Sequence, residues 1–265
     1  MAGGATIINQ NKMKKRYLIL FAAVLMWAAD CRHTEPETGT LEINFKGSFG
    51  GEPLMMYADD YPYPDNMQVK WQLFQFFLSD IDLLSSGGKT EAKEVDQVNF
   101  GSVQSADAAA AGITLVLTDV PIGEYTGIQL GMGVNEDLNK TKPADHSAKD
   151  PLGSAANYWT DAGSYIFTKL EGNADLNGDG DFSDAKLTFH IGNAGGYRTK
   201  SWDKAISIKS NQTTRINFTV DMLKALSDGQ GNFINFRETT QVHGGNAEIA
   251  VFIQDRLLNE SLELK

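Results

Sequence analysis

A ten-residue acidic segment, DLNGDGDFSD over residues 175–184, has the composition of a cation site. The order Asp175, Asn177, Asp179, Gly180 matches the opening of a calcium loop of the D-x-[DN]-x-D-G type. Calcium takes about six to eight oxygen ligands, and alternate carboxylates on a tight turn supply several of them. The predicted calcium ligands are the acidic and amide side chains of this segment, Asp175, Asn177, Asp179, Asp181 and Asp184.

This segment departs from an EF-hand in its last position and in its flanks. Lys186 stands where that motif has a bidentate glutamate. The residues that follow alternate with a period of two, since Leu187, Phe189 and Ile191 are apolar, and this pattern predicts a strand. We therefore expect a β-hairpin tip that holds a structural calcium ion. A solvated acidic turn without a cation is the alternative.

The elements that must position such a site follow from apolar periodicity. Short runs rich in aromatic and β-branched residues, separated by glycine and proline turns, predict strands over residues 41–45, 70–84, 113–118, 125–130, 165–170, 187–191, 205–208 and 214–220. Helices are predicted over residues 221–227 and 246–258, the second with Asn246 as N-cap. The expected fold is all-β, an antiparallel β-sandwich with one or two short helices near the C-terminus.

The N-terminal region has the pattern of an export signal. A basic run at residues 13–16 precedes an apolar run at residues 17–29, which is too short to span a bilayer comfortably. Residues 1–12 are then an upstream extension and residues 13–30 the signal peptide. Cys31, the only cysteine, cannot form an internal disulfide, and its position resembles a bacterial lipidation site. An ordinary secretion signal with an incidental cysteine is the alternative.

The remaining chain suits a single exported domain. Residues 31–40 are polar and form the expected lipid-attached linker, and residues 41–265 form one β domain. We expect it in the periplasm or at the cell surface, anchored to a bacterial membrane by lipid on Cys31. A net charge of −11 argues against nucleic acid as a partner, because phosphates require a basic surface.

Five segments carry a resemblance to a known family. They are NFKGSFGGEPL (44–54), LTDVPIGEYTGIQLGMGV (117–134), DPLGSAANYWTDAGSYIFTKLEG (150–172), FHIGNAGG (189–196) and VHGGNAEIA (242–250). In this order they resemble the MbnP-like family, the methanobactin-associated periplasmic copper-binding proteins and their lipoprotein relatives. The resemblance covers nearly all of the chain after the signal.

The resemblance implies a secreted or lipid-anchored β protein that binds copper. In that family a di-haem peroxidase of the MauG type oxidises a tryptophan to kynurenine, which helps histidines to bind the metal. Residue by residue, it makes His190 and His243 the candidate copper ligands and Trp159 the candidate oxidation target. The chain departs from the family pattern at Asp161 and Gly47, where the family has tryptophan and commonly histidine.

The residues themselves also allow less specific roles. The strand pattern places His190 opposite Phe189 and Ile191, so it faces a groove or solvent. His243 precedes a predicted helix, whose dipole disfavours imidazolium and so favours a neutral ligand. Either histidine has a surface or helix-end structural role as its alternative, and Trp159 has a core role. His33 and His146 lie in polar stretches and are weaker candidates.

Two functions therefore remain in view, and neither is an enzyme, because no catalytic arrangement is visible. The first is an extracytoplasmic copper-binding lipoprotein with a possible MauG-type peroxidase partner. The alternative is a cell-surface binding or interaction β-sandwich that keeps a structural calcium loop and binds no copper.

Overall fold

The computed structural model describes residues 1, 3, 37–58, 60–193, 196–243 and 247–265. The chain divides into two units, Met1–Pro36 and Glu37–Lys265, and all helices and strands below belong to the second. The predicted signal peptide, His33, the lipidation candidate Cys31 and the predicted N-cap Asn246 lie outside the described residues. Among the helices that are described, none has the length and apolarity needed to cross a membrane.

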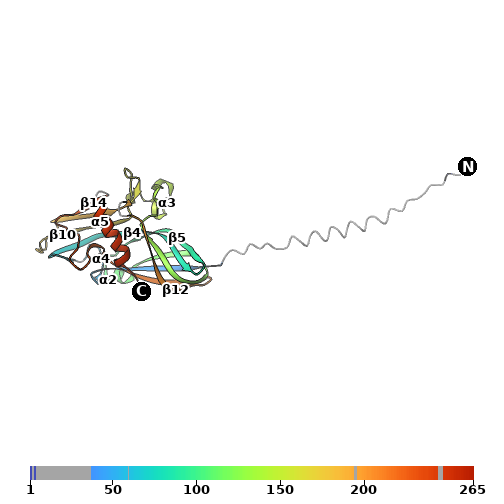
Figure 1. The fold of residues 1–265 in the computed structure, drawn as a ribbon, viewed down its shortest axis with the longest axis horizontal. Helices are drawn as coiled ribbons and strands as arrows, with labels where there is room; N and C mark the ends of the chain where they lie inside the picture. The colour runs from blue at the N-terminus through green and yellow to red at the C-terminus, as the bar shows by residue number, and fades with distance from the viewer. Residues whose placement is uncertain (2, 4–36, 59, 194–195, 244–246) are drawn as a thin grey trace. The chain divides into compact units, whose positions relative to one another are not determined.

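The first of two large sheets is built on β1 (Figure 1). This strand, Thr38–Phe49, starts within the last residues of the predicted linker and runs parallel to β13, Thr213–Asp221. On its other side it pairs with β2 (Glu52–Pro53) and with β6 (Ile113–Pro121). The C-terminal strand β15, Leu262–Leu264, pairs with β13.

The second sheet is built on β4, Met67–Ser85, a continuous 19-residue strand. It pairs with the antiparallel strands β3 (Tyr61–Tyr63), β5 (Gly88–Asn99), β7 (Gly123–Met132) and β10 (Thr168–Asp175). The sheet continues through β12 (Arg198–Ile208) beside β7, and through β11 (Ala185–Ile191) and β14 (Gln241–His243) beyond β10. A small hairpin joins β8 (Tyr158–Trp159) to β9 (Ser164–Tyr165).

Two apolar clusters stabilise these layers. The large one lies between the sheets and includes stacked aromatic pairs such as Phe45 with Phe218 and Tyr63 with Phe236. The small one lies on the opposite face of β4, where Phe77 packs with Leu152 and Phe167. The segment between β7 and β10 therefore covers one end of the outer face of the second sheet.

The predicted all-β sandwich is confirmed, and the predicted strands lie within observed ones, with residues 165–170 split between β9 and β10. The sheets are nevertheless mixed, because β1 with β13 and β11 with β14 are parallel pairs. Parallel neighbours need long crossover connections, and most of the chain separates β1 from β13. The alternation of apolar and polar residues within a strand does not reveal whether its neighbour is parallel or antiparallel.

Short helices also occur before the C-terminal region. Helix α2, Ala106–Ala111, begins where the Ser105 side chain accepts the backbone N–H of Ala108, and its alanine run favours a helix. Helix α3, Glu136–Asn139, is capped by Asn135 in the same way. Three 3₁₀ turns, at Pro143–Asp145, Pro151–Gly153 and Ala155–Asn157, complete the segment over the small cluster.

Both predicted C-terminal helices are present. Helix α4 spans Met222–Leu226, with Asp221 as its N-cap. Helix α5 spans Ala247–Arg256 and continues into a π-helical turn, Leu257–Ser261. Gln254 on α5 is fully buried; its Oε1 accepts from Thr168 at 3.0 Å and its Nε2 donates to the Met132 carbonyl at 3.3 Å. One buried amide thus joins α5 to β10 and β7.

Replacing Gln254 by alanine should destabilise the fold, because Thr168 and the Met132 carbonyl would lose their buried partner. The expected loss in free energy of unfolding is about 1–3 kcal/mol. Denaturant unfolding measures this loss, and the exposed Glu248→Ala variant on the same helix is the control. Equal stability of the two variants would contradict the proposed role of the amide.

Candidate metal sites

The two candidate copper ligands meet across a parallel strand pair. Leu187, Phe189 and Ile191 point from β11 into the core, so His190 faces outward between them, as predicted. The register of β11 and β14 makes His190 the direct partner of His243. Their rings stack with centroids 4.9 Å apart and planes at 4°.

The histidine pair ends a row of polar side chains that crosses five strands. Successive register partners from β5 to β14 are Asn99, Gln75, Lys169, His190 and His243. Asn99 donates to Gln75 at 3.1 Å, and Gln75 donates to Asn157 at 2.9 Å. Lys169 donates to the carbonyl of Ala156. The covering segment between β7 and β10 thus holds the middle of the row, and the histidines occupy its open end.

Glu171 is the site residue that sequence analysis missed. It lies one residue beyond the predicted strand 165–170, and its Oε1 is 2.7 Å from His190 Nε2. A carboxylate accepts the hydrogen bond, so Nε2 carries the proton and Nδ1 of the neutral ring keeps its lone pair. The outward alternation of Lys169 and Glu171 along β10 was the signal available in the sequence.

The electrostatic environment favours the neutral ring of His190. Burial lowers the pKa of this imidazole, while the hydrogen bond and charge of Glu171 act in the opposite direction. The net effect is a pKa below the ordinary histidine value. His190 is therefore in the form that can bind a metal at neutral pH.

The ring orientation sets a condition on metal binding. An imidazole binds a metal in the plane of its ring, and two parallel stacked planes do not direct their lone pairs at one point. His243 is exposed, whereas the side chain of His190 is only 16% exposed and is held by Glu171. The donor set suits copper, provided that the ring of His243 turns to bring its lone pair toward the ion.

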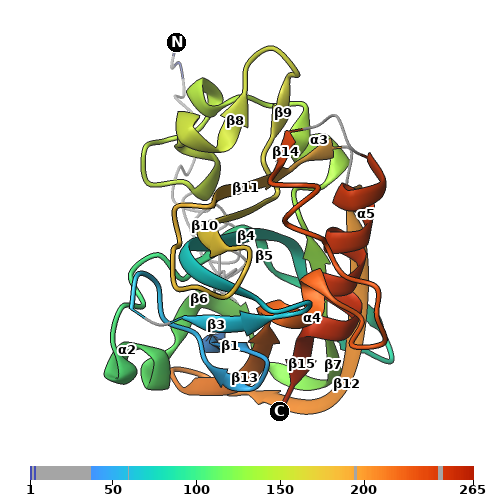
Figure 2. The same cartoon turned by 90° about the vertical axis from the view of Figure 1, so that its left-hand side faces the viewer.

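Trp159 lies at the same edge of the sheet. It is half-buried on β8, which Figure 2 shows at the same end of the domain as β14. A methyl group on Gly192 would meet Trp159 Cζ3 at 2.6 Å and the Tyr165 carbonyl oxygen at 2.8 Å. Because Gly192 follows His190 by two residues, its lack of a side chain lets the indole pack beside the strand that carries His190.

Three further positions from the sequence analysis, Gly47, Asp161 and His146, do not join the histidine pair. A side chain at Gly47 would meet Leu54 and Phe100 of the core, so this position is not part of the histidine row. Asp161 is exposed in the turn between β8 and β9. His146 lies near Thr141 Oγ1, at 2.7 Å, and packs edge-on against Tyr165.

The acidic segment forms the tip of the β10–β11 hairpin, as predicted. Carboxylate oxygens of Asp175, Asp179 and Asp184 lie within 4.8 Å of one another. Over the described ranges, no other group of three or more histidine, cysteine or acidic side chains meets this criterion. Asp181 lies outside the cluster, where its Oδ1 accepts the N–H of Ser183, and Asn177 Oδ1 accepts that of Asp179. The three clustered oxygen donors fit a hard cation such as calcium.

Asp175 organises this loop. The residue is fully buried and accepts backbone N–H groups from Asn177 at 3.0 Å, Gly178 at 2.7 Å and Gly180 at 2.7 Å. Burial acts to raise the pKa of this carboxyl, but the hydrogen bonds from Gly180, Gly178 and Asn177 outweigh it and the pKa is lowered. A negative charge is therefore fixed at the base of the loop.

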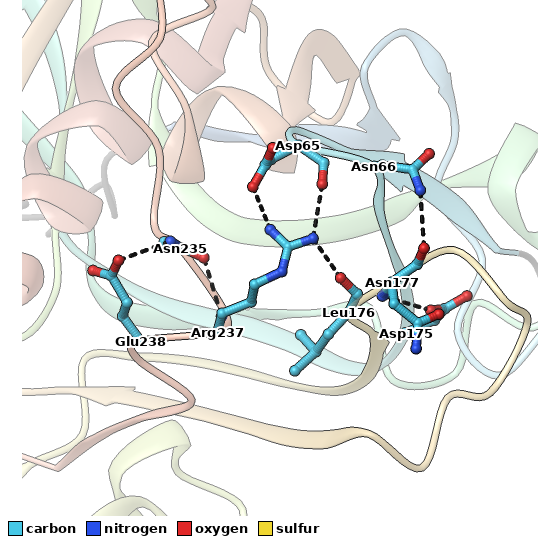
Figure 3. A network of polar contacts seen from close by, with 8 residues as sticks. All are labelled: Asp65, Asn66, Asp175, Leu176, Asn177, Asn235, Arg237 and Glu238. Carbon is cyan, nitrogen blue, oxygen red and sulfur yellow. Dashed lines mark hydrogen bonds and ion pairs between the residues drawn. The ribbon is translucent and has the colours of Figure 1, made fainter.

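Arg237 anchors the loop to two other segments (Figure 3). Its guanidinium pairs with the Asp65 carboxylate and donates to the carbonyls of Asp65 and Leu176. Asn66 donates to the Asn177 carbonyl at 2.9 Å. The turn before β4, the acidic loop and the segment before β14 are thus joined by one side chain.

Comparison with known proteins assigns the family. A family model described as MbnP matches residues 38–245. The chain belongs to the MbnP family. This range contains every candidate metal ligand described above and begins with the first residue of β1.

A solved structure described as MbnP from Methylosinus trichosporium is similar to this MbnP-family chain. The two are 14% identical and superpose with a TM-score of 0.46, over 80% of this chain and 82% of the other. The search among curated protein sequences returned no match.

Replacing Glu171 by glutamine should lower the pKa of His190 further. The carboxylate raises this pKa by hydrogen bonding and charge, and both contributions weaken when it is neutralised. Imidazole-detected NMR titration of the metal-free protein measures the shift. The control is Glu124→Gln, which removes a carboxylate that accepts from Ser207 on another part of the sheet. An unchanged or higher pKa in Glu171→Gln would contradict the assignment.

Proposed function

We propose that this protein binds copper outside the cytoplasm through His190 and His243, and that it has no enzymatic activity of its own. The observation that carries the proposal is the register of β11 and β14, which brings two histidines remote in sequence into ring contact. Imidazole is a preferred ligand of copper among first-row metals. Membership of the MbnP family supports the same choice of metal.

His190 would bind through Nδ1. Its Nε2 is engaged by Glu171, and a carboxylate partner on the second nitrogen is the usual arrangement for a metal-bound histidine. Glu171 thus acts as a positioning residue that fixes the tautomer and orientation of the ring. His243, at the exposed end of β14, would supply the second imidazole after its ring turns.

Trp159 would be the target of a partner di-haem peroxidase of the MauG type. Its indole lies against Gly192 at the edge of the histidine row, and it is half-exposed. Trp71, by contrast, is fully buried in the aromatic core. Oxidation of Trp159 to kynurenine would add a carbonyl and an aromatic amine beside the imidazoles, and copper retained between them would be stored or handed on.

The location that this function requires agrees with the export signal predicted over residues 13–30. Lipid on Cys31 would attach the domain to a bacterial membrane through a short polar linker. The domain would then face the periplasm or the cell surface, where a secreted peroxidase can reach Trp159.

The purified protein should retain copper, and His190→Ala and His243→Ala should each lose it. Metal analysis after dialysis measures bound copper. His146→Ala is the matched control, because that histidine is partly buried and its contacts are with Thr141 and Tyr165 rather than with the other two histidines. Glu171→Gln should weaken copper binding by about 10–100-fold, as expected for a residue that orients a ligand.

Co-expression with the peroxidase should change the mass of the peptide that holds Trp159, with the Trp71 and Trp202 peptides as internal controls.

Copper binding that survives both histidine substitutions would refute the site. A wild-type protein that takes up no copper before or after peroxidase treatment would favour the alternative, a surface interaction module with a structural calcium ion.

The acidic hairpin tip would hold that calcium ion in either case. Three carboxylates within 4.8 Å repel one another, and a divalent cation would offset this repulsion. Its role would be to order the loop, since the loop precedes β11 and His190 lies near the far end of that strand.

Calcium should therefore raise the melting temperature of the wild-type protein, and magnesium should do so less. A ligand at about 100 times its dissociation constant stabilises the folded state by about 2.7 kcal/mol. Asp179→Ala should abolish most of the calcium response, because Asp179 is an exposed member of the cluster. Asp161→Ala, which removes an exposed carboxylate from another turn, should respond like wild type. An equal calcium response in all three proteins would exclude the loop as the site.

A further inference from the structure

A polar cavity of about 510 Å³ opens beside the histidine row and is not explained by metal binding. Its volume lies within the usual range of small-molecule sites. The lining side chains that matter here are Tyr57, Gln72, Asn99, Ser102, Gln104 and Glu171. They come from the turn before β3, from β4, from β10, and from the end of β5 with the segment after it, so four segments of the chain build one concave surface.

Tyr57 holds an aromatic ring at the cavity in an unusual backbone conformation. Its φ of 61° is in the left-handed region, which a bulky residue rarely adopts. The backbone is kept there because Tyr57 N–H donates to the Trp71 carbonyl at 2.8 Å and Met56 N–H donates to that of Val103 at 2.7 Å. The residue is 62% exposed and is not part of the buried core. Strained residues that do not serve packing tend to occur where a protein holds a ligand.

The polar groups of the cavity differ in how they are engaged. Asn99 is held by Gln75 and Gly101, and Gln104 donates to the Gly101 carbonyl, so both are fixed in place. Within the described part of the chain, no protein hydrogen bond engages the side chains of Gln72 and Ser102. Glu171 uses Oε1 for His190, which leaves its second oxygen for a ligand.

This set of groups matches a ligand that carries several hydroxyl groups. Amides and hydroxyls both donate and accept, and Glu171 accepts, which matches hydroxyl groups that do both. An apolar ligand would leave Glu171 and Gln72 desolvated without partners, and an anion would face the charge of Glu171. The exposed ring of Tyr57 offers a flat apolar surface to the C–H face of a sugar.

We propose that this cavity binds a neutral saccharide, which lies against the Tyr57 ring and hydrogen-bonds to Gln72, Ser102 and Glu171. The proposal is independent of copper, because it requires neither histidine to bind a metal. Glu171 borders both sites. A sugar hydroxyl bound to its second carboxylate oxygen would therefore share this carboxylate with His190.

Saturation-transfer NMR on the metal-free full chain tests the proposal with cellobiose, maltose, lactose and diacetylchitobiose as probes. At least one disaccharide should receive saturation from aromatic protons, with a dissociation constant of the order of millimolar. The imidazole resonances of His190 should shift in the same titration. If none of the four probes binds, the proposal is wrong.

Variants of Tyr57 separate binding from folding. Tyr57→Phe keeps the ring and should bind like wild type, whereas Gln72→Ala should weaken binding about tenfold. Tyr57→Gly should abolish binding and yet keep or raise the melting temperature, because glycine adopts positive φ without strain. A folded Tyr57→Gly or Gln72→Ala protein that binds the sugar as wild type does would overturn the assignment.

Discussion

Strand β4 is the element on which the rest of the second sheet depends. It forms ladders with β3, β5, β7 and β10, and through β10 it fixes the register of β11 and β14. Because side chains alternate along every strand, one register decides which residues face outward together. A slip of one residue between β10 and β11 would turn His190 into the core and expose Phe189. The buried aromatic residues of β4 and β11 therefore hold the histidine pair in place as firmly as any contact of the histidines themselves.

The outward row also keeps its titratable groups partly buried. Lys169 is buried, and desolvation lowers the pKa of its ammonium group while Glu171 opposes the shift. Glu171 thus lies near Lys169 and His190, and burial lowers the pKa of both of these groups. A metal ion at Nδ1 of His190 would bring positive charge to this carboxylate, which a neutral histidine does not supply. Burial therefore disfavours a protonated ring within the row.

Most of the strands were predictable from the sequence, because their apolar residues alternate and their turns carry glycine or proline. The hairpin at the acidic segment was predicted for the same reason, since Leu187, Phe189 and Ile191 share one face. The pairing of His190 with His243 was not predictable, because it depends on a parallel register between strands remote in the chain. Glu171 was missed for a related reason. A single carboxylate on a strand indicates a site only once its neighbour on the next strand, here His190, is known. Helix α2 was missed because a short alanine run carries no amphipathic pattern.

The acidic loop and the histidine pair are connected through β11 and β14, although they lie at opposite ends of these strands. The loop ends where β11 begins, and β11 ends at Ile191, directly after His190. Arg237 joins the loop at Leu176 to the segment that leads into β14, and the N–H of Thr188 donates to the Thr240 carbonyl at 2.8 Å as the two strands come together. Ordering the loop with a cation would restrain the starting points of both strands at once. The ladder between β11 and β14 makes His190 and His243 direct register partners. The acidic loop and Arg237 thus lie where the strand pair begins, and the two histidines lie where it ends.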